Sequence, residues 1–215
     1  AFCLLTATAY GQKSNILPNL SADHAKQVLI CDGNQDFKTP TSEHIANEKI
    51  GIEHALTTHS LQTKMVKSTR LIDHLKMGSK QTVVAFGTSL TAVGAWVDQL
   101  RTVFNQQFPG QVNLINGAQG GANSDWGVKN LDKKVLKHRP DCVFIEFSIN
   151  DAVGSRRTAV EDARKNLNNM IDRILEKNPL CEIILMVMNT PVGHTRERRP
   201  NLPAFENNYR EVAKE

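Results

Sequence analysis

The chain is poor in the features that mark membrane proteins, disulfide-rich proteins and zinc-binding proteins. It has only 4 Cys and 6% aromatic residues in 215. No stretch reaches the roughly 18 apolar residues of a membrane-spanning helix. The cysteines are too few for a disulfide framework, and none stands in the Cys-x-x-Cys spacing of zinc sites. The remaining composition, 40% hydrophobic and 22% charged, is that of an ordinary globular protein with one sizeable core.

The excess of positive charge is also small. Lys and Arg number 26 against 22 Asp and Glu, which gives a net charge of +4 at pH 7. The dense basic runs are Arg156-Arg157 and residues 196–199. A nucleic-acid-binding protein usually gathers many Lys and Arg on one face, so we expect no nucleic-acid partner.

The first part of the chain is expected to differ from the rest. Residues 1–12 begin with AFCLLTATA, an apolar run that ends in small residues, as a secretory signal does before its cleavage site. This predicts a signal-peptide remnant and a secreted or periplasmic protein of a bacterium; a short buried strand or helix is the alternative. Residues 13–80 are polar and then helical in pattern, most clearly from Leu61 to Gly78, which predicts an N-terminal helical extension without a strand.

From residue 81 onward, short apolar runs alternate with helical patterns. The runs are rich in β-branched residues and nearly continuous in hydrophobicity, as are strands buried on both faces of a parallel sheet. The predicted fold of residues 81–215 is therefore an α/β three-layer sandwich with a mainly parallel sheet and right-handed crossovers. The predicted strands cover residues 82–86, 112–115, 142–147 and 183–188.

Polar and glycine-rich residues follow these strands. Ser89 comes after the first strand, a loop rich in Gly and Asn at 116–124 after the second, and Asn150 after the third. The carboxyl ends of parallel strands meet at one edge of the sheet, where such folds bind ligands. A serine at a tight turn can act as a nucleophile, while glycine and asparagine N–H groups can hold the oxyanion of ester hydrolysis.

These segments, in this order, resemble three of the four sequence blocks of the SGNH (GDSL-type) hydrolase family. The resemblance implies a flavodoxin-like SGNH hydrolase fold with Ser89 as the nucleophile. It also implies that the N–H groups of Ser89 and Gly121 and the side chain of Asn150 hold the oxyanion, with Gly120 as the alternative to Gly121. The matching segments are FGTSLT at 86–91, INGAQGGANS at 115–124 and FIEFSINDA at 144–152.

The implied function is serine-dependent hydrolysis of carboxylic esters without a cofactor. By resemblance the substrates are small acyl esters, such as acetyl groups on carbohydrate; a lipase or thioesterase acting on longer acyl chains is the alternative. A carbohydrate-binding or scaffold protein that keeps the fold without its chemistry also stays open. A nucleotide binder is disfavoured, because the loop at 87–90 is too short to wrap a phosphate. The histidines lack ligand spacing, so no metal site is expected.

The sequence departs from the family in two places. Thr88 stands where the family usually has Asp, which we expect to tune the site rather than abolish it. The fourth block, Asp-x-x-His, supplies the general base in the family and does not occur in this sequence. We expect it beyond residue 215, and we expect a chain without it to have little or no activity, because an unassisted serine hydroxyl is a poor nucleophile. His194 is the alternative base.

The candidate residues also have structural interpretations. Ser89 is suited to cap a helix, and Asn150 is suited to stabilise a turn. Asp151 is expected to support its loop or cap the next helix rather than to take part in the chemistry. A further candidate contact for an anionic or sugar substrate, with a solvated loop as the alternative, is the basic group Arg196, Arg198 and Arg199.

Overall fold

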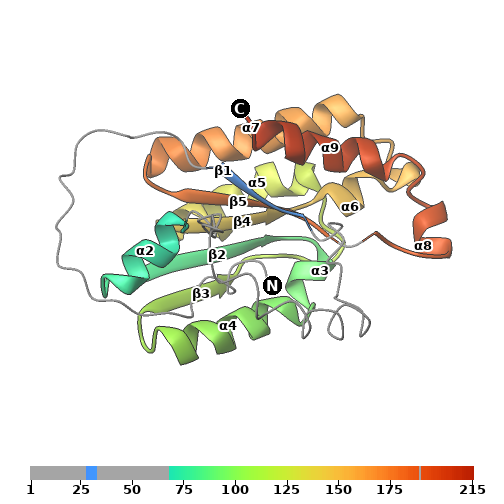
Figure 1. Cartoon of the computed structure of the whole chain (residues 1–215). Helices are drawn as coiled ribbons and strands as arrows, with labels where there is room; N and C mark the ends of the chain where they lie inside the picture. Colours follow the sequence, from blue (N-terminus) through green and yellow to red (C-terminus); the bar gives the residue numbers. More distant parts are fainter. Residues whose placement is uncertain (1–27, 33–67, 189) are drawn as a thin grey trace, which may run out of the picture. The chain divides into compact units, whose positions relative to one another are not determined.

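The computed structural model of the chain, which describes residues 28–32, 68–188 and 190–215, contains a parallel sheet (Figure 1). The strand order is β1-β5-β4-β2-β3, and every pair of neighbours is parallel. Parallel neighbours need crossover connections, which helices supply here. The strands are β1 (Val28–Asp32), β2 (Gln81–Gly87), β3 (Val112–Asn116), β4 (Cys142–Glu146) and β5 (Glu182–Val187).

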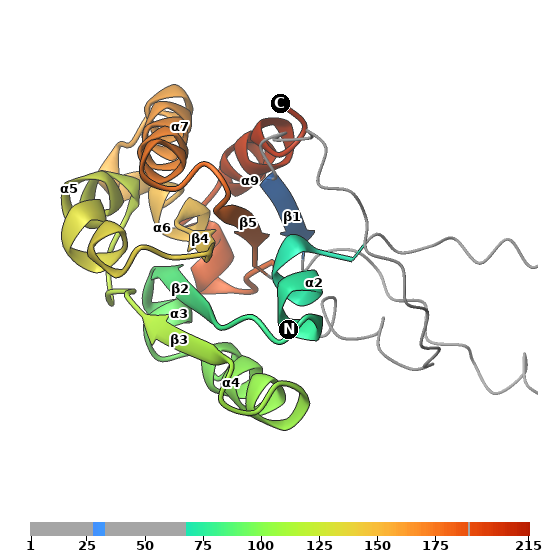
Figure 2. The same cartoon turned by 90° about the vertical axis from the view of Figure 1, so that its left-hand side faces the viewer.

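Helices cover both faces of this sheet (Figures 1 and 2). One face packs against α2 and α4, and the other against α5, α7 and α9. The three-layer α/β/α sandwich that the sequence predicts is therefore confirmed. The helices are α2 (Arg70–Lys76), α3 (Ser89–Ala92), α4 (Trp96–Gln107), α5 (Ser124–Lys134), η2 (Leu136–His138), α6 (Ser148–Asp151), η3 (Gly154–Arg156), α7 (Val160–Lys177), α8 (His194–Glu197) and α9 (Leu202–Val212).

The interior strand β2, which lies between β4 and β3, contributes to the core on both sides of the sheet. Val84 and Phe86 pack in the core next to α5, α7 and α9, whereas Val83 and Ala85 pack in the core next to α2 and α4. All four side chains are fully buried. Burial of a Val or Phe side chain contributes about 1.5 to 3 kcal/mol, so the turn that follows β2 starts from a firmly held strand.

The connections diverge at the carboxyl ends of β2 and β4. From β2 the chain crosses through α4 to β3 on one side, and from β4 it crosses through α7 to β5 on the other. The register pairs Gly87 with Glu146 where these two strands end. In open α/β sheets, the crevice beyond such a pair of strands is the usual place for a ligand.

The prediction of a helical extension without a strand is wrong at residues 28–32. These residues form β1, which pairs with β5 from Val28 opposite Ile183 to Asp32 opposite Val187. The run VLICD shows no polar–apolar alternation, and a short apolar run does not by itself distinguish a strand from part of a helix.

In the described residues 68–80 of the same segment, the structure shows the helix α2. Helix α2 begins after its N-cap Thr69 and ends at Lys76, just before Gly78, whose φ is +83°. The signal-peptide remnant predicted at residues 1–12 lies outside the described residues. Among the helices of the described ranges, none is long and apolar enough to cross a membrane.

Candidate active site

The turn between β2 and α3 carries Ser89 at the carboxyl edge of the sheet. Ser89 is the first residue of α3, and Thr88 is the N-cap, accepting a hydrogen bond from Leu90 N at 3.2 Å. The interpretation of Ser89 as a helix cap is therefore wrong. Ser89 is half-buried, and its hydroxyl makes no hydrogen bond within the described part of the chain. Among the described residues, the hydroxyl therefore has no competing hydrogen-bond partner.

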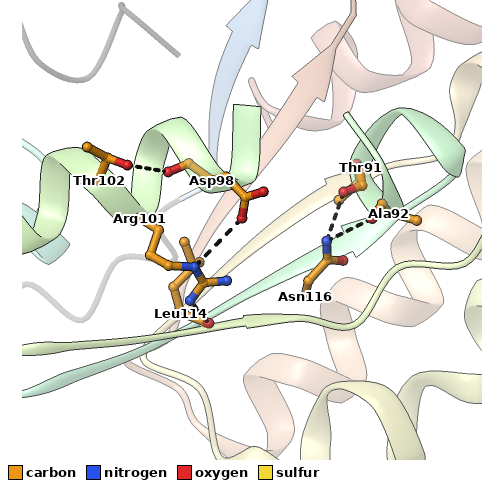
Figure 3. Close-up of polar contacts among 7 residues, drawn as sticks. All are labelled: Thr91, Ala92, Asp98, Arg101, Thr102, Leu114 and Asn116. Atoms are coloured by element: carbon orange, nitrogen blue, oxygen red, sulfur yellow. Dashed lines mark hydrogen bonds and ion pairs between the residues drawn. The ribbon is translucent and has the colours of Figure 1, made fainter. Parts of the chain in front are cut away.

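The glycine-rich loop after β3 is bonded to this turn. Gln119 N donates to Gly87 O at 3.0 Å. Asn116 Nδ2 donates to the carbonyl oxygens of Thr91 at 3.0 Å and Ala92 at 3.3 Å. Figure 3 shows the Asn116 side chain reaching from the end of β3 to these two carbonyls of α3. The short helix that begins with Ser89 is therefore fixed to the neighbouring strand.

The same close-up shows how α4 is held beside β3 (Figure 3). Arg101 donates from Nη1 to Leu114 O at 2.8 Å, and its Nε lies 3.8 Å from Asp98 Oδ1. These contacts join the helix that follows α3 to the middle of β3. β3 therefore supports the serine-bearing turn through its contacts with α3 and through its contact with α4.

Gly121 lies at the exposed end of the glycine-rich loop. Its φ is +74°, and a Cβ added there would meet no atom within 4 Å. The backbone conformation, rather than crowding, therefore favours glycine at this position. Gly120, the alternative oxyanion donor, is absent from the glycines with positive φ. Arg156 donates from Nη2 to Gly121 O at 2.6 Å and so holds this loop from the side of η3.

Asn150 anchors the glycine-rich loop from α6. It is only 8% exposed, and its Nδ2 donates to Ala122 O at 2.8 Å. A carboxamide nitrogen carries two hydrogens, and this bond uses one of them. Asp151 Oδ1 accepts a hydrogen bond from Ser124 N at 2.8 Å, at the start of α5. Asp151 therefore supports the loop, as expected, and burial raises the pKa of its carboxyl to about 6.

These bonds join three loops that are far apart in the sequence into one rim. The loop after β2 is tied to the loop after β3 through Gly87 and Gln119, and the loop after β3 to α6 through Ala122 and Asn150. A serine hydroxyl, a glycine-rich backbone and a carboxamide thus lie in adjoining, mutually bonded segments. Such a set suits attack on a carbonyl carbon and stabilisation of the resulting oxyanion.

The rim also contains a buried carboxylate that the sequence did not indicate as a site residue. Glu146, the last residue of β4, is 1% exposed. Its Oε2 accepts hydrogen bonds from Thr88 N at 3.1 Å, Thr88 Oγ1 at 2.8 Å and Thr91 Oγ1 at 3.0 Å. Burial raises its pKa from 4.5 to about 7, although these hydrogen bonds act in the opposite direction. The available signal was one carboxylate at the end of the otherwise apolar run CVFIE.

His194, the alternative base, lies on the short helix α8. Its side chain is 80% exposed, and its Nδ1 lies 3.4 Å from Glu197 Oε2. Within the described residues no hydrogen bond or ion pair joins His194 to Ser89. The structure therefore shows His194 as an exposed residue paired on its own helix.

The arginines that follow α8 border α6. Arg199 donates from Nε to Ile149 O at 2.7 Å, and Gly154 N donates to Arg198 O at 3.0 Å. Burial, with the nearby charges of Arg198 and Arg156, lowers the pKa of Arg199. Three guanidinium groups from two segments thus gather beside the loop that carries Asn150. Arg196 is exposed on α8.

The chain is similar to known proteins in sequence and in fold. Residues 85–215 match the GDSL-like lipase/acylhydrolase family. No curated protein matches the sequence significantly. Among solved structures, a lipase/acylhydrolase from Enterococcus faecalis is 29% identical, with a TM-score of 0.55 over 62% of this chain and 71% of that one.

Two further structures share the fold at lower identity. TesA is 23% identical, with a TM-score of 0.52 over 62% of this chain and 73% of its own. An acetyl-xylooligosaccharide esterase from Geobacillus is 19% identical, with a TM-score of 0.53 over 65% of this chain and 74% of its own. The family match extends over more than half of the chain and includes the loops that carry Ser89, Gly121 and Asn150. The chain therefore belongs to the GDSL-like lipase/acylhydrolase family, a family of ester-hydrolysing enzymes.

Proposed function

We propose that this protein hydrolyses short acyl esters with Ser89 as its nucleophile. The Ser89 hydroxyl oxygen attacks the ester carbonyl carbon and gives its proton to a general base. The tetrahedral oxyanion then collapses, the C–O bond to the alcohol breaks, and the base returns the proton to the departing alcohol. Water attacks the acylated Ser89 in the same way and releases the carboxylic acid.

Three N–H groups are assigned to the oxyanion: the backbone N–H groups of Ser89 and Gly121 and the Nδ2 of Asn150. The observation that supports this proposal is the set of hydrogen bonds that joins the three loops at the rim. Within it, Asn150 donates one Nδ2 hydrogen to Ala122 O and does not use the other in this bond. Donors that are fixed before the substrate arrives need no reorganisation as the negative charge develops.

The general base is assigned to no residue of this sequence. The Asp-x-x-His block that the family resemblance implies does not occur within it. His194 is largely exposed and paired with Glu197. Activity is therefore to be measured on the protein as its gene encodes it, so that every residue of the natural chain is present.

The proposed substrate is an acetyl or other short acyl ester on a carbohydrate. The acetyl-xylooligosaccharide esterase from Geobacillus shares the fold, and the arginines beside α6 offer donors to hydroxyl-rich or anionic groups. Longer acyl chains are the competing substrates, and exposed apolar residues of the serine-bearing turn favour them. Leu90 is 37% exposed and Val93 is 85% exposed.

Replacing Ser89 tests the nucleophile. Ser89→Ala should abolish hydrolysis of p-nitrophenyl acetate and leave the free energy of unfolding unchanged. Ser79→Ala is the matched control, because Ser79 is an exposed serine just before β2, at the opposite end of that strand. It should keep the wild-type rate. A wild-type rate in Ser89→Ala would refute the assignment.

Two further measurements separate the alternatives. Asn150→Ala should lower kcat by about 10²- to 10³-fold if its side chain holds the oxyanion, whereas a drop below about threefold would make Asn150 structural. Acetate, butyrate and octanoate esters of p-nitrophenol distinguish short from long acyl groups. An inactive wild-type protein that nevertheless binds acetylated xylan would favour the carbohydrate-binding alternative.

A further inference from the structure

Glu146 joins the end of β4 to the turn that carries Ser89. Its Oε2 accepts hydrogen bonds from the Thr88 amide, the Thr88 hydroxyl and the Thr91 hydroxyl, all within 2.8 to 3.1 Å. Thr88 directly precedes Ser89, and Thr91 lies two residues after it. One carboxylate oxygen therefore holds the turn on both sides of the proposed nucleophile.

The distribution of these bonds indicates a carboxylate rather than a carboxylic acid. A neutral carbonyl oxygen has two lone pairs, and hydrogen bonds to an ionised oxygen are the stronger ones. Three donors converge on Oε2, which favours the ionised form. The other oxygen, Oε1, is buried and has no hydrogen-bond partner among the described residues. A proton taken up by Glu146 would therefore go to Oε1 and withdraw negative charge from Oε2.

Glu146 packs directly against Gly87 at the end of β2. A Cβ added to Gly87 would lie 2.6 Å from Glu146 O and 2.8 Å from Glu146 Oε2. Real Cβ atoms do not approach so closely. The strand end, the carboxylate and the turn are thus in direct contact. A change in the charge on Oε2 acts on the turn rather than being absorbed by solvent.

We propose that Glu146, as a carboxylate, is a positioning residue that holds the Ser89 turn in its reactive geometry through Thr88 and Thr91. This inference rests on the proposed role of Ser89. Glu146 itself touches neither the Ser89 hydroxyl nor, in the proposed mechanism, the substrate. Displacing a reacting group by about 1 Å can lower a rate by about 100-fold, so the quality of these three bonds matters for turnover.

Protonation of Glu146 falls within the working pH range of an enzyme. Burial raises its pKa to about 7, and the charge of Asp151 on α6 adds to the rise. Tyr209 on α9 also interacts electrostatically with Glu146, and burial raises the pKa of that phenol above its ordinary value. As the pH falls, Glu146 is therefore expected to be protonated before most other carboxylates, and its hydrogen bonds to the turn are expected to weaken.

The test compares Glu146→Gln with the wild type across pH. Gln keeps the shape and one acceptor oxygen but carries no charge, so it imitates protonated Glu146. The ratio of wild-type kcat to variant kcat should be about 10 to 100 near pH 8.5 and should approach about 1 near pH 5. KM should stay within about twofold. Any other titrating group, including the general base, cancels in this ratio. A ratio that stays near 1 at all pH values, or does not change with pH, overturns the proposal.

Two additional variants keep the test decisive if Glu146→Gln folds poorly. Thr91→Val removes one donor to Oε2 and should lower kcat, whereas Thr91→Ser keeps the hydroxyl and should restore it. Equal kcat values for the two variants would overturn the proposal. Glu182→Gln, a buried carboxylate at the other end of the sheet, is the control and should keep the wild-type kcat and its pH profile.

Hydrogen exchange separates this inference from the proposed function. In a Ser89→Ala background, the Thr88 amide should exchange about tenfold faster when Glu146 is also replaced by Gln, because this amide donates to Oε2. If Ser89→Ala remains active but the exchange rate changes, the nucleophile assignment fails and the hold of Glu146 on the turn stands. If Ser89 is confirmed but neither exchange nor kcat responds to Glu146→Gln, only the role of Glu146 fails.

Discussion

Two buried glutamates at opposite ends of the sheet differ in how their oxygens are used. Glu182 opens β5, and its two oxygens accept from the first amides of α2: Oε1 from Arg70 N at 3.1 Å and Oε2 from Leu71 N at 2.9 Å. Glu146 closes β4 and receives all three of its hydrogen bonds on one oxygen. Burial raises the pKa of both carboxyls.

The difference shows that burial alone does not mark a functional carboxylate. Glu182 meets the unpaired N–H groups that every helix start presents, so its contacts are complete and serve to attach α2 to the sheet. Glu146 keeps a buried oxygen without a described partner beside the proposed nucleophile. Unsatisfied buried polar atoms are rare in folded proteins and call for an explanation. We therefore assign stability to the amino edge of the sheet and function to its carboxyl edge.

Two glycines provide the strongest test of this contrast. Gly87→Ala at the carboxyl edge should lower the free energy of unfolding by about 3 kcal/mol, because the new methyl overlaps Glu146 and Thr91. It should also reduce ester hydrolysis by more than about 100-fold. Gly78→Ala at the amino edge meets no neighbour but requires a φ of +83°. It should cost about 1 to 2 kcal/mol without affecting kcat. Denaturant unfolding and steady-state kinetics measure both, and equal kinetic defects would remove the contrast.

The next prediction concerns the effect of Glu146 on the pH dependence of the free energy of unfolding. A carboxyl with a higher pKa in the folded protein binds more protons there, so its contribution is full at low pH and declines as the pH rises. For Glu146 the decline runs from about pH 4.5 to about pH 7 and amounts to about 3 kcal/mol. Glu146→Gln removes this component, so its stability relative to wild type should improve by that amount across the interval.

Unfolding in denaturant at a series of pH values measures the effect. The exposed Glu161→Gln on α7 is the control and should follow the wild-type curve. Asp151, whose pKa is raised to about 6, contributes to the slope of both the wild-type and the Glu146→Gln curves. Parallel curves for these two proteins would show that Glu146 titrates alike in the folded and unfolded chains.

Glu182→Gln is expected to act on stability alone. The amide can accept one of the two helix amides, but its NH₂ group faces the other, which leaves a buried N–H unpaired. Such a loss costs about 2 kcal/mol, measurable by denaturant unfolding. The kcat should remain within about twofold of wild type. A kinetic defect comparable to that of Glu146→Gln would mean that the two edges are coupled.

Much of the fold can be predicted from the sequence because its strands coincide with short apolar runs. The strands predicted from residue 81 onward all occur, and their parallel arrangement follows from the helices between them. β1 was not predicted, because residues 28–32 can be recognised as a strand only from their pairing with β5. The loops that carry Ser89, Gly121 and Asn150 could be found because each follows a recognisable strand. The roles of these three residues remain predictions.

The sequence by itself determined the order of strands and helices from residue 81 onward, the three loops at one edge and the family resemblance, because these depend on residue type and spacing along the chain. Only the tertiary structure decided that Thr88 is the N-cap of α3 and that Asp151 accepts a hydrogen bond from the start of α5. It also decided that Glu146 accepts hydrogen bonds from the serine-bearing turn, whereas Glu182 accepts them from the start of α2. The two glutamates read alike in a sequence. Their surroundings differ because β5 begins beside the first amides of α2, whereas β4 ends beside a turn with two hydroxyls.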